Sequence, residues 1–193
     1  MLTHIGTVTL TTPRLVLRRI ATSDAQAMYD NWATDEKVTK YLDWDVHESV
    51  EATRELLIKW TADYENLYTY HWVIELDGTI IGTISLHNIH SWHERCEVGY
   101  CIGSRWWGRG VMTEALGAVI RFAFEKLSAH KIFARHDVDN VGSGKVMIKN
   151  GMRQEGLLRE ENMRKDGSRG DIALYAILAD EYNEAILADE YRE

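Results

Sequence analysis

The spacing of hydrophobic and polar residues along the chain changes between two periods, and these changes mark the predicted elements. Alternation with a period of two is typical of strands, and recurrence every three to four residues is typical of helices. Helical spacing predicts helices over 48–66 and from 111 onward. A capping-box pattern, Ser23-Asp24-Ala25-Gln26, predicts another helix that begins at Ser23, and residues 14–20 before it form the first predicted strand.

Three further strands are predicted in the middle of the chain, over 68–76, 79–89 and 95–103. Asp77-Gly78 between the first two is a two-residue hairpin signal, so we expect these strands to form an antiparallel meander. Two more strands, over 152–165 and 170–178, end the pattern and are joined at Asp166-Gly167.

The helix from Val111 separates the strand over 95–103 from another over 131–138. A strand–helix–strand unit of this kind joins parallel neighbours. A short helix over 141–149 follows, with Asp139-Asn140 as its cap and Asn150-Gly151 as its stop. The predicted fold class is therefore α/β (α+β): a mixed, mostly antiparallel sheet with a central parallel strand pair and helices on both faces.

Length and composition indicate one domain over 1–193, because the 193 residues include one proline and no Ser/Gly-rich linker. The tail contains a tandem repeat, AILADEYNE over 176–184 followed by AILADEYRE over 185–193. We expect the first copy to finish the last strand and about 179–193 to form a terminal helix. Chain ends tolerate additions, and we assign this duplication no function.

The net charge of −8 is opposite to that of most nucleic-acid-binding domains, so no nucleic-acid partner is expected. No apolar run approaches the roughly 20 residues of a membrane span, and no signal-peptide pattern is visible. Cys96 and Cys101 are five residues apart and would face opposite sides of one strand, so no disulfide is expected. These features favour a cytoplasmic protein.

The segment Arg105-Trp106-Trp107-Gly108-Arg109-Gly110 lies between a predicted strand and the helix from Val111. A helix N-terminus presents unpaired N–H groups and a positive dipole end, and glycines let backbone amides approach a phosphate. The dinucleotide fingerprint fails here because Thr113 replaces its third glycine. A P-loop around Gly144-Lys145 fails because Asp139 and Val146 replace required residues. A pyrophosphate cradle built on R-x-x-G-x-G remains.

With these motifs, nearly the whole chain resembles the GCN5-related N-acetyltransferase superfamily, and within it the ribosomal-protein N-terminal acetyltransferases. The resemblance rests on Thr12 to Arg18, Glu97 to Tyr100, Trp107 to Gly110, Thr113 to Ala115, Asn140, Ser143, Lys149 to Gly151, and Glu155-Gly156. It implies direct acetyl transfer in a ternary complex from acetyl-CoA to a primary amine, most simply the N-terminal α-amine of a protein such as a ribosomal protein.

The resemblance also implies site residues. Glu97, beside the coenzyme loop, is the predicted general base, with Glu160 and Glu161 as lesser candidates. Ser143 is the predicted donor to the leaving thiolate. The predicted acetyl-CoA-binding residues are Cys101, Ile102, Arg105, Trp106, Trp107, Gly108, Arg109, Gly110, Val111, Met112, Asn140 and Ser143.

Two other functions stay open at this stage. A small-molecule acceptor such as a polyamine or aminoglycoside would suit clustered carboxylates, for which Asp43, Asp45, Glu48 and Glu51 are available. A non-catalytic acyl-CoA-binding sensor is the second alternative. No metal site is expected, because His87, His90 and His93 alternate faces on a strand, although they can line an acceptor groove together with Trp32, Tyr41 and Trp44. Oligomeric state, monomer or homodimer, is not decided by the sequence.

Overall fold

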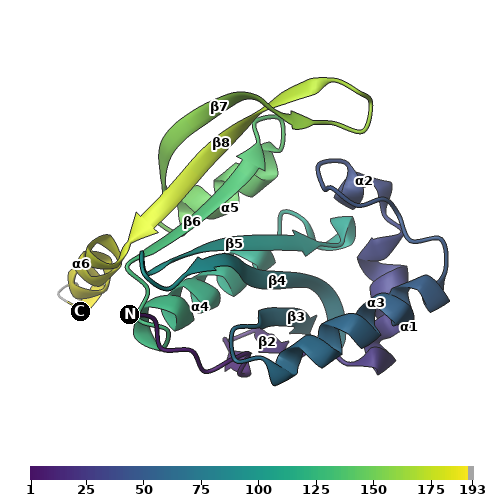
Figure 1. Ribbon diagram of the computed structural model, residues 1–193, viewed down its shortest axis with the longest axis horizontal. Coiled ribbons are helices and arrows are strands. Elements are labelled where there is room, and N and C mark those ends of the chain that lie inside the picture. The colour runs from purple at the N-terminus through teal and green to yellow at the C-terminus, as the bar shows by residue number, and fades with distance from the viewer. Residues whose placement is uncertain (191–193) are drawn as a thin grey trace.

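A computed structural model describes residues 1–190, with side chains as far as Ala185. The fold is one mixed sheet with helices against both of its faces (Figure 1). Its strands are β1 (Leu10–Thr11), β2 (Leu15–Arg18), β3 (Tyr70–Leu76), β4 (Thr79–His90), β5 (Arg95–Ile102), β6 (Lys131–Asp137), β7 (Arg153–Met163) and β8 (Arg169–Leu178). Its helices are α1 (Ala25–Met28), α2 (Glu36–Thr39), α3 (Val50–Ala62), α4 (Val111–Glu125), α5 (Val141–Lys149) and α6 (Ala179–Glu190).

The sheet order is β1-β2-β3-β4-β5-β6-β8-β7. All neighbours are antiparallel except β5 and β6, which confirms the predicted parallel pair and the predicted fold class. The turn at Asp77-Gly78 has positive φ at both residues, as the hairpin signal requires. β8 lies between β6 and β7, so β7 is an edge strand and its side chains are mostly exposed.

Two hydrophobic clusters lie on opposite faces of the sheet, because side chains alternate along each strand. Trp72 and Ile74 of β3 pack with α4 on one face, and the intervening Val73 packs with α1 and α3 on the other. Cys96 and Cys101 follow the same rule, since Cys96 joins the α4 cluster and Cys101 the α1–α3 cluster. The prediction that they face opposite sides is confirmed, and both are free thiols.

The predicted helix start at Ser23 is wrong. Residues Thr22–Asp24 form a 3-10 turn, α1 begins at Ala25, and the chain continues through the π-helical turn Tyr29–Ala33. The capping carboxylate belongs to Asp24, whose Oδ2 accepts from the Ala21 N–H at 2.8 Å. Asp24 also pairs with Arg18 at 2.8 Å, so its carboxylate is held by Ala21 and Arg18, and the turn begins at Thr22, one residue before the position that the local pattern indicates.

The first copy of the tail repeat ends β8 at Leu178 and begins α6, as expected. The second copy continues α6 to Glu190, and residues 191–193 lie outside the described residues. Tyr182 of the first copy packs on Phe124 of α4 with ring centroids 4.9 Å apart. The start of α6 is therefore joined to the main core.

Candidate functional site

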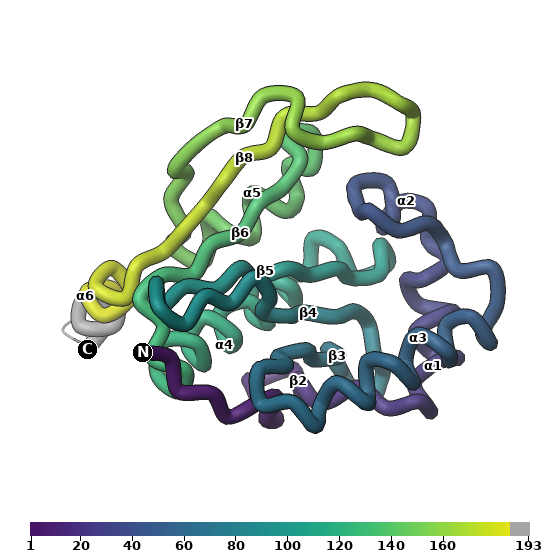
Figure 2. Tube along the Cα trace, in the orientation of Figure 1, coloured from purple at the N-terminus to yellow at the C-terminus, as the bar shows by residue number. Residues whose placement is uncertain are grey.

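β5 and β6 pair only at their beginnings, and then separate. Three residue pairs join them, from Arg95↔Lys131 to Glu97↔Phe133. Beyond Glu97, β5 stays paired with β4 as far as Ile102, while β6 stays paired with β8 as far as Asp137. The two halves of the sheet therefore diverge, as the strand traces show (Figures 1 and 2). Residues 98–102 of β5 lie along this divergence with one edge free of strand pairing within the described part of the chain.

The predicted cradle lies at the end of β5, where a 3-10 turn, Ser104–Trp106, leads to the start of α4. Gly108 and Gly110 both have φ of +73°, the left-handed region that favours glycine. Gly110 is the residue before α4, so its conformation sets the direction in which the first N–H groups of the helix point. The structure thus places a helix N-terminus with positive dipole beside the diverging strands.

The other predicted coenzyme residues differ in where their side chains lie. Arg109 and Trp107 are exposed on the loop. Arg105 is exposed but points to the segment after α1, where its guanidinium donates to Asn31 Oδ1 at 2.7 Å. Trp106 lies beneath Arg105 and packs against the α4 cluster. The side chains of Cys101, Ile102, Val111 and Met112 pack in the two hydrophobic clusters, so a ligand beside them would meet mainly their backbone atoms.

Ser143 lies on α5 opposite the divergent part of β5. The Tyr100 hydroxyl from β5 lies 3.1 Å from both the Oγ and the carbonyl oxygen of Ser143. Burial raises the pKa of Tyr100 to about 12, although the Ser143 contact opposes this shift. Asn140 caps α5 as predicted, since its Oδ1 accepts from the Ser143 N–H at 3.4 Å. Two hydroxyls therefore meet across the divergence.

Glu97 is buried, with 4% of its surface exposed, and is the last β5 residue paired with β6. Its Oε2 accepts from Asn88 Nδ2 at 2.7 Å and its Oε1 accepts from Arg135 Nε at 2.8 Å. His87 Nε2 lies 3.6 Å from the same Oε1. Burial raises the pKa of Glu97, but the His87, Asn88 and Arg135 groups outweigh it and bring the pKa to about 2. At neutral pH this carboxylate is charged and has little affinity for a proton.

The low pKa of Glu97 gives the protein an acid-sensitive stability. A carboxyl group whose pKa is lower in the folded than in the unfolded state stabilises the fold above its unfolded pKa, and that stability is lost as pH falls toward the folded pKa. We expect the melting temperature of the wild type to fall more steeply than that of Glu97→Gln between pH 5 and about 2. Thermal melts across this range check the slope, and parallel curves would contradict it.

The segment between α2 and α3 contacts the β6–α5 connection and the β7–β8 hairpin. The Tyr41 hydroxyl donates to the Asp139 carbonyl at 3.3 Å. Lys165 Nζ donates to the Trp44 carbonyl at 2.6 Å and pairs with Asp45 at 2.9 Å. These contacts place Tyr41 and Trp44 across the divergence from the cradle, whereas Trp32 is fully buried in the α1–α3 cluster.

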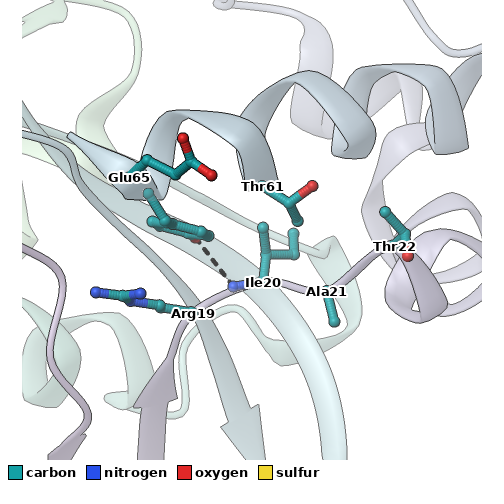
Figure 3. Close-up of a pocket in the computed structure, with 7 residues that line it drawn as sticks. Arg19, Ile20, Ala21, Thr22, Thr61 and Glu65 are labelled. Atoms are coloured by element: carbon teal, nitrogen blue, oxygen red, sulfur yellow. Dashed lines mark hydrogen bonds between the residues drawn. The ribbon is translucent and has the colours of Figure 1, made fainter.

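Two hollows on the described part of the surface differ in chemistry. The first lies where β2 meets the end of α3 (Figure 3), and its Tyr64 hydroxyl is used structurally, accepting from the Ile20 N–H and donating to the His71 carbonyl. The second is lined by Tyr68, Thr69, Tyr70, His71, Ser85, Leu86, His87, Asn88 and Ile89. It adjoins the buried Glu97 through His87 and Asn88, and is therefore the hollow associated with the site.

Sequence reasoning missed Tyr100 as the partner of Ser143, and Asn88 and Arg135 as partners of Glu97. None has a local signal, because each pairs with a residue brought near by the sheet or by α5. His87 was considered only as one of three groove residues. The other two, His90 and His93, stack on each other at 4.2 Å at the β4–β5 turn.

Among the side chains that the structure describes, residues 1–185, no cluster of three or more His, Cys, Asp or Glu groups is arranged to hold a metal ion. None of the helices described is both long enough and apolar enough to cross a membrane.

The divergent parallel pair, the glycine-bearing loop before α4 and the hydroxyl and carboxylate groups around them define an N-acetyltransferase. The sequence model of the acetyltransferase (GNAT) domain matches residues 14–153, and the chain belongs to this family. The expected superfamily is therefore confirmed.

Relatives cover nearly the full chain. An uncharacterized N-acetyltransferase of Bacillus subtilis, YoaA, is 33% identical over 88% of this chain and 96% of its own. The ribosomal protein uS5-alanine N-acetyltransferase of Escherichia coli is 28% identical over 93% of this chain and 95% of its own. The structure of RimL, the ribosomal L7/L12 α-N-protein acetyltransferase in complex with coenzyme A, shares the fold with a TM-score of 0.81 and 21% identity over 90% of this chain and 99% of its own.

Proposed function

We propose that this protein transfers the acetyl group of acetyl-CoA directly to the N-terminal α-amine of a protein, such as a ribosomal protein. The observation that carries the proposal is the divergence of β5 from β6 after Glu97, together with the left-handed loop of Gly108 and Gly110 that follows the end of β5. In this proposal the loop and the start of α4 bind the pyrophosphate of acetyl-CoA. The free edge of residues 98–102 lies along its pantetheine arm and thioester.

The groups around the divergence suit the two ends of the reaction. Amine attack forms the C–N bond and breaks the C–S bond, and one proton leaves the amine while one ends on the CoA thiol. A backbone N–H on the free edge of β5 stabilises the oxygen of the tetrahedral intermediate. The Ser143 hydroxyl, held by Tyr100, donates to the leaving thiolate. The carboxylate of Glu97 acts on the side of the site where the acceptor amine gives up its proton.

An α-amine is the acceptor that this site suits best. At pH 7 about one α-amine in ten is neutral, against fewer than about one lysine amine in a thousand. A highly basic acceptor would need a strong base, and a Glu97 carboxyl with a pKa of about 2 is not one. The relatives named for ribosomal-protein alanine and L7/L12 α-amines support the same choice.

Two of the four carboxylates that would favour a polyamine already lie beside cationic side chains. Asp45 is already paired with Lys165 at 2.9 Å, and Glu51 lies 3.7 Å from Arg54. A cationic substrate would have to compete with these side chains. This observation ranks the small-amine acceptor second.

Acetyl-CoA-dependent release of free thiol against a mixed acceptor panel tests the proposal. Peptides with Ala, Ser or Met at the N-terminus are compared with the same peptides carrying a blocked N-terminus, and with polyamines and aminoglycosides. We expect turnover on the free peptides alone. Turnover on small amines alone would show that the acceptor is a small amine and not a protein N-terminus. Binding of acetyl-CoA without turnover on any acceptor would favour a non-catalytic acyl-CoA-binding sensor.

A further inference from the structure

We propose that His87 accepts the proton from the acceptor amine, and that Glu97 is the positioning residue that holds its imidazole. This inference rests on the proposed function and assigns the proton-accepting role that the Glu97 carboxyl cannot fill well. Its starting point is geometry: His87 Nε2 lies 3.6 Å from Glu97 Oε1, at the position where β5 and β6 separate.

A β-bulge brings the partners of Glu97 to one face of the sheet. Successive residues on a regular strand face opposite sides, so His87 and Asn88 should not share a partner. The β4–β5 register shifts between His87 and His90, and Asn88 has a φ of +46°. Asparagine tolerates this left-handed conformation better than most residues. Bulges of this kind re-aim side chains, and this one lets the Asn88 amide reach Glu97 from beside His87.

The absence of a side chain at Gly99 leaves room for the imidazole of His87. A Cβ built on Gly99 would lie 2.8 Å from His87 Cε1 and 3.5 Å from Nδ1. The first of these contacts is too short for a real side chain, so the ring could not keep this position beside a larger residue. The ring therefore lies over the β5 backbone at Gly99, one residue before Tyr100, whose hydroxyl meets Ser143. His87 is on the face opposite α4, and its side chain remains 44% exposed. It can thus be reached from the hollow formed by β3 and β4.

The neighbours of His87 leave one ring nitrogen free. Nε2 faces the buried Glu97 carboxylate at 3.6 Å, so this nitrogen is turned toward a negative charge and Nδ1 is turned away from it. Nδ1 has no hydrogen-bond partner among the described residues and lies over Gly99. Arg135 donates to the same Glu97 oxygen and offsets its charge. Glu97 therefore acts mainly by holding the ring in one orientation.

The other titratable groups facing this hollow do not compete for the role. His71, from β3, packs edge-on against Trp60, and burial lowers its pKa to about 4. The Tyr70 hydroxyl is used by His4 and the Ile5 N–H. In the reaction the amine forms its bond to the acetyl carbon, its proton passes to His87 Nδ1, and the C–S bond breaks to release the thiolate.

The first test is kinetic, with the acceptor that the panel identifies. We expect His87→Gln to lower kcat about 100-fold with little change in KM for acetyl-CoA. In His87→Ala, added imidazole should restore activity, and substituted imidazoles should restore more as their pKa rises. Glu97→Gln should lower kcat less, and Glu97→Asp should recover part of that loss. The control His130→Gln, at an exposed histidine just before β6, should behave like the wild type. Full activity in His87→Gln would overturn the proposal.

The second test does not need turnover. Bromoacetyl-CoA carries an alkylating carbon where the acetyl methyl would lie, and mass spectrometry of the labelled full-length protein locates the modified residue. We expect modification of His87, protection by acetyl-CoA, and no label at this peptide in His87→Gln. Modification elsewhere, or none despite acetyl-CoA binding, would overturn the role of His87. Failure of wild-type protein to bind acetyl-CoA in calorimetry would instead overturn the proposed function.

Discussion

Replacing Gly108 and Gly110 together by valine is expected to weaken acetyl-CoA binding about 100-fold or more. Both residues have φ of +73°, and a β-branched residue held there costs about 1–3 kcal/mol. The loop would relax to another backbone conformation, and the first N–H groups of α4 would no longer share one direction. Two such costs of about 1.4 kcal/mol each correspond to a 100-fold change in affinity. Calorimetric titration of acetyl-CoA measures it.

The chain offers a matched control for this strain. Gly78 in the β3–β4 turn has a φ of +75°, and a Cβ there meets nothing within 4 Å, as at Gly108. Gly78→Val therefore carries the same backbone cost without touching the loop before α4. It should lower the melting temperature while leaving acetyl-CoA affinity within about threefold of wild type. If the double variant bound acetyl-CoA as tightly as Gly78→Val, the loop would not be the cradle.

Local patterns predicted the features of the site that depend on neighbouring residues. The glycine pair marked the loop because only glycine adopts its conformation cheaply, and Asn140 marked the start of α5 because its side chain caps the next turn. The strand–helix–strand order was enough to predict that β5 and β6 are parallel. It did not show where they separate, because pairing along a strand depends on contacts made by the whole sheet.

Contacts between distant residues account for what the sequence did not show. Arg105 was predicted to bind acetyl-CoA, and its guanidinium also donates to Asn31, 74 residues away, a contact that no local pattern indicates. Glu97 was expected to be a base, and that role stays untested. Its surroundings, however, include Arg135 from another strand and Asn88 from a bulge, and they lower its pKa to about 2. The sequence identifies a charged residue, but it does not show which residues of other elements will lie against it.

The second large effect concerns the leaving group. We expect Ser143→Ala to lower kcat about 100-fold, because the thiolate would then leave without a hydrogen-bond donor from α5. The KM for acetyl-CoA should change little, since Asn140 continues to cap the helix through a backbone N–H. Single-turnover measurement of thiol release separates this step from binding. A rate within about threefold of wild type would remove Ser143 from the reaction.

Tyr100 provides a test of whether the two hydroxyls act as a unit. Its oxygen lies 3.1 Å from Ser143 Oγ, so Tyr100→Phe should also lower kcat, and the double variant should lose less than the product of the two single effects. Tyr175→Phe is the matched control, because Tyr175 is also a buried tyrosine packed in the α4 cluster and bonds only weakly to Gln154 at 3.5 Å. Independent effects of Ser143→Ala and Tyr100→Phe would mean that the hydroxyl pair positions α5 without sharing the proton. Coupled effects would mean that Tyr100 sets the direction in which Ser143 donates.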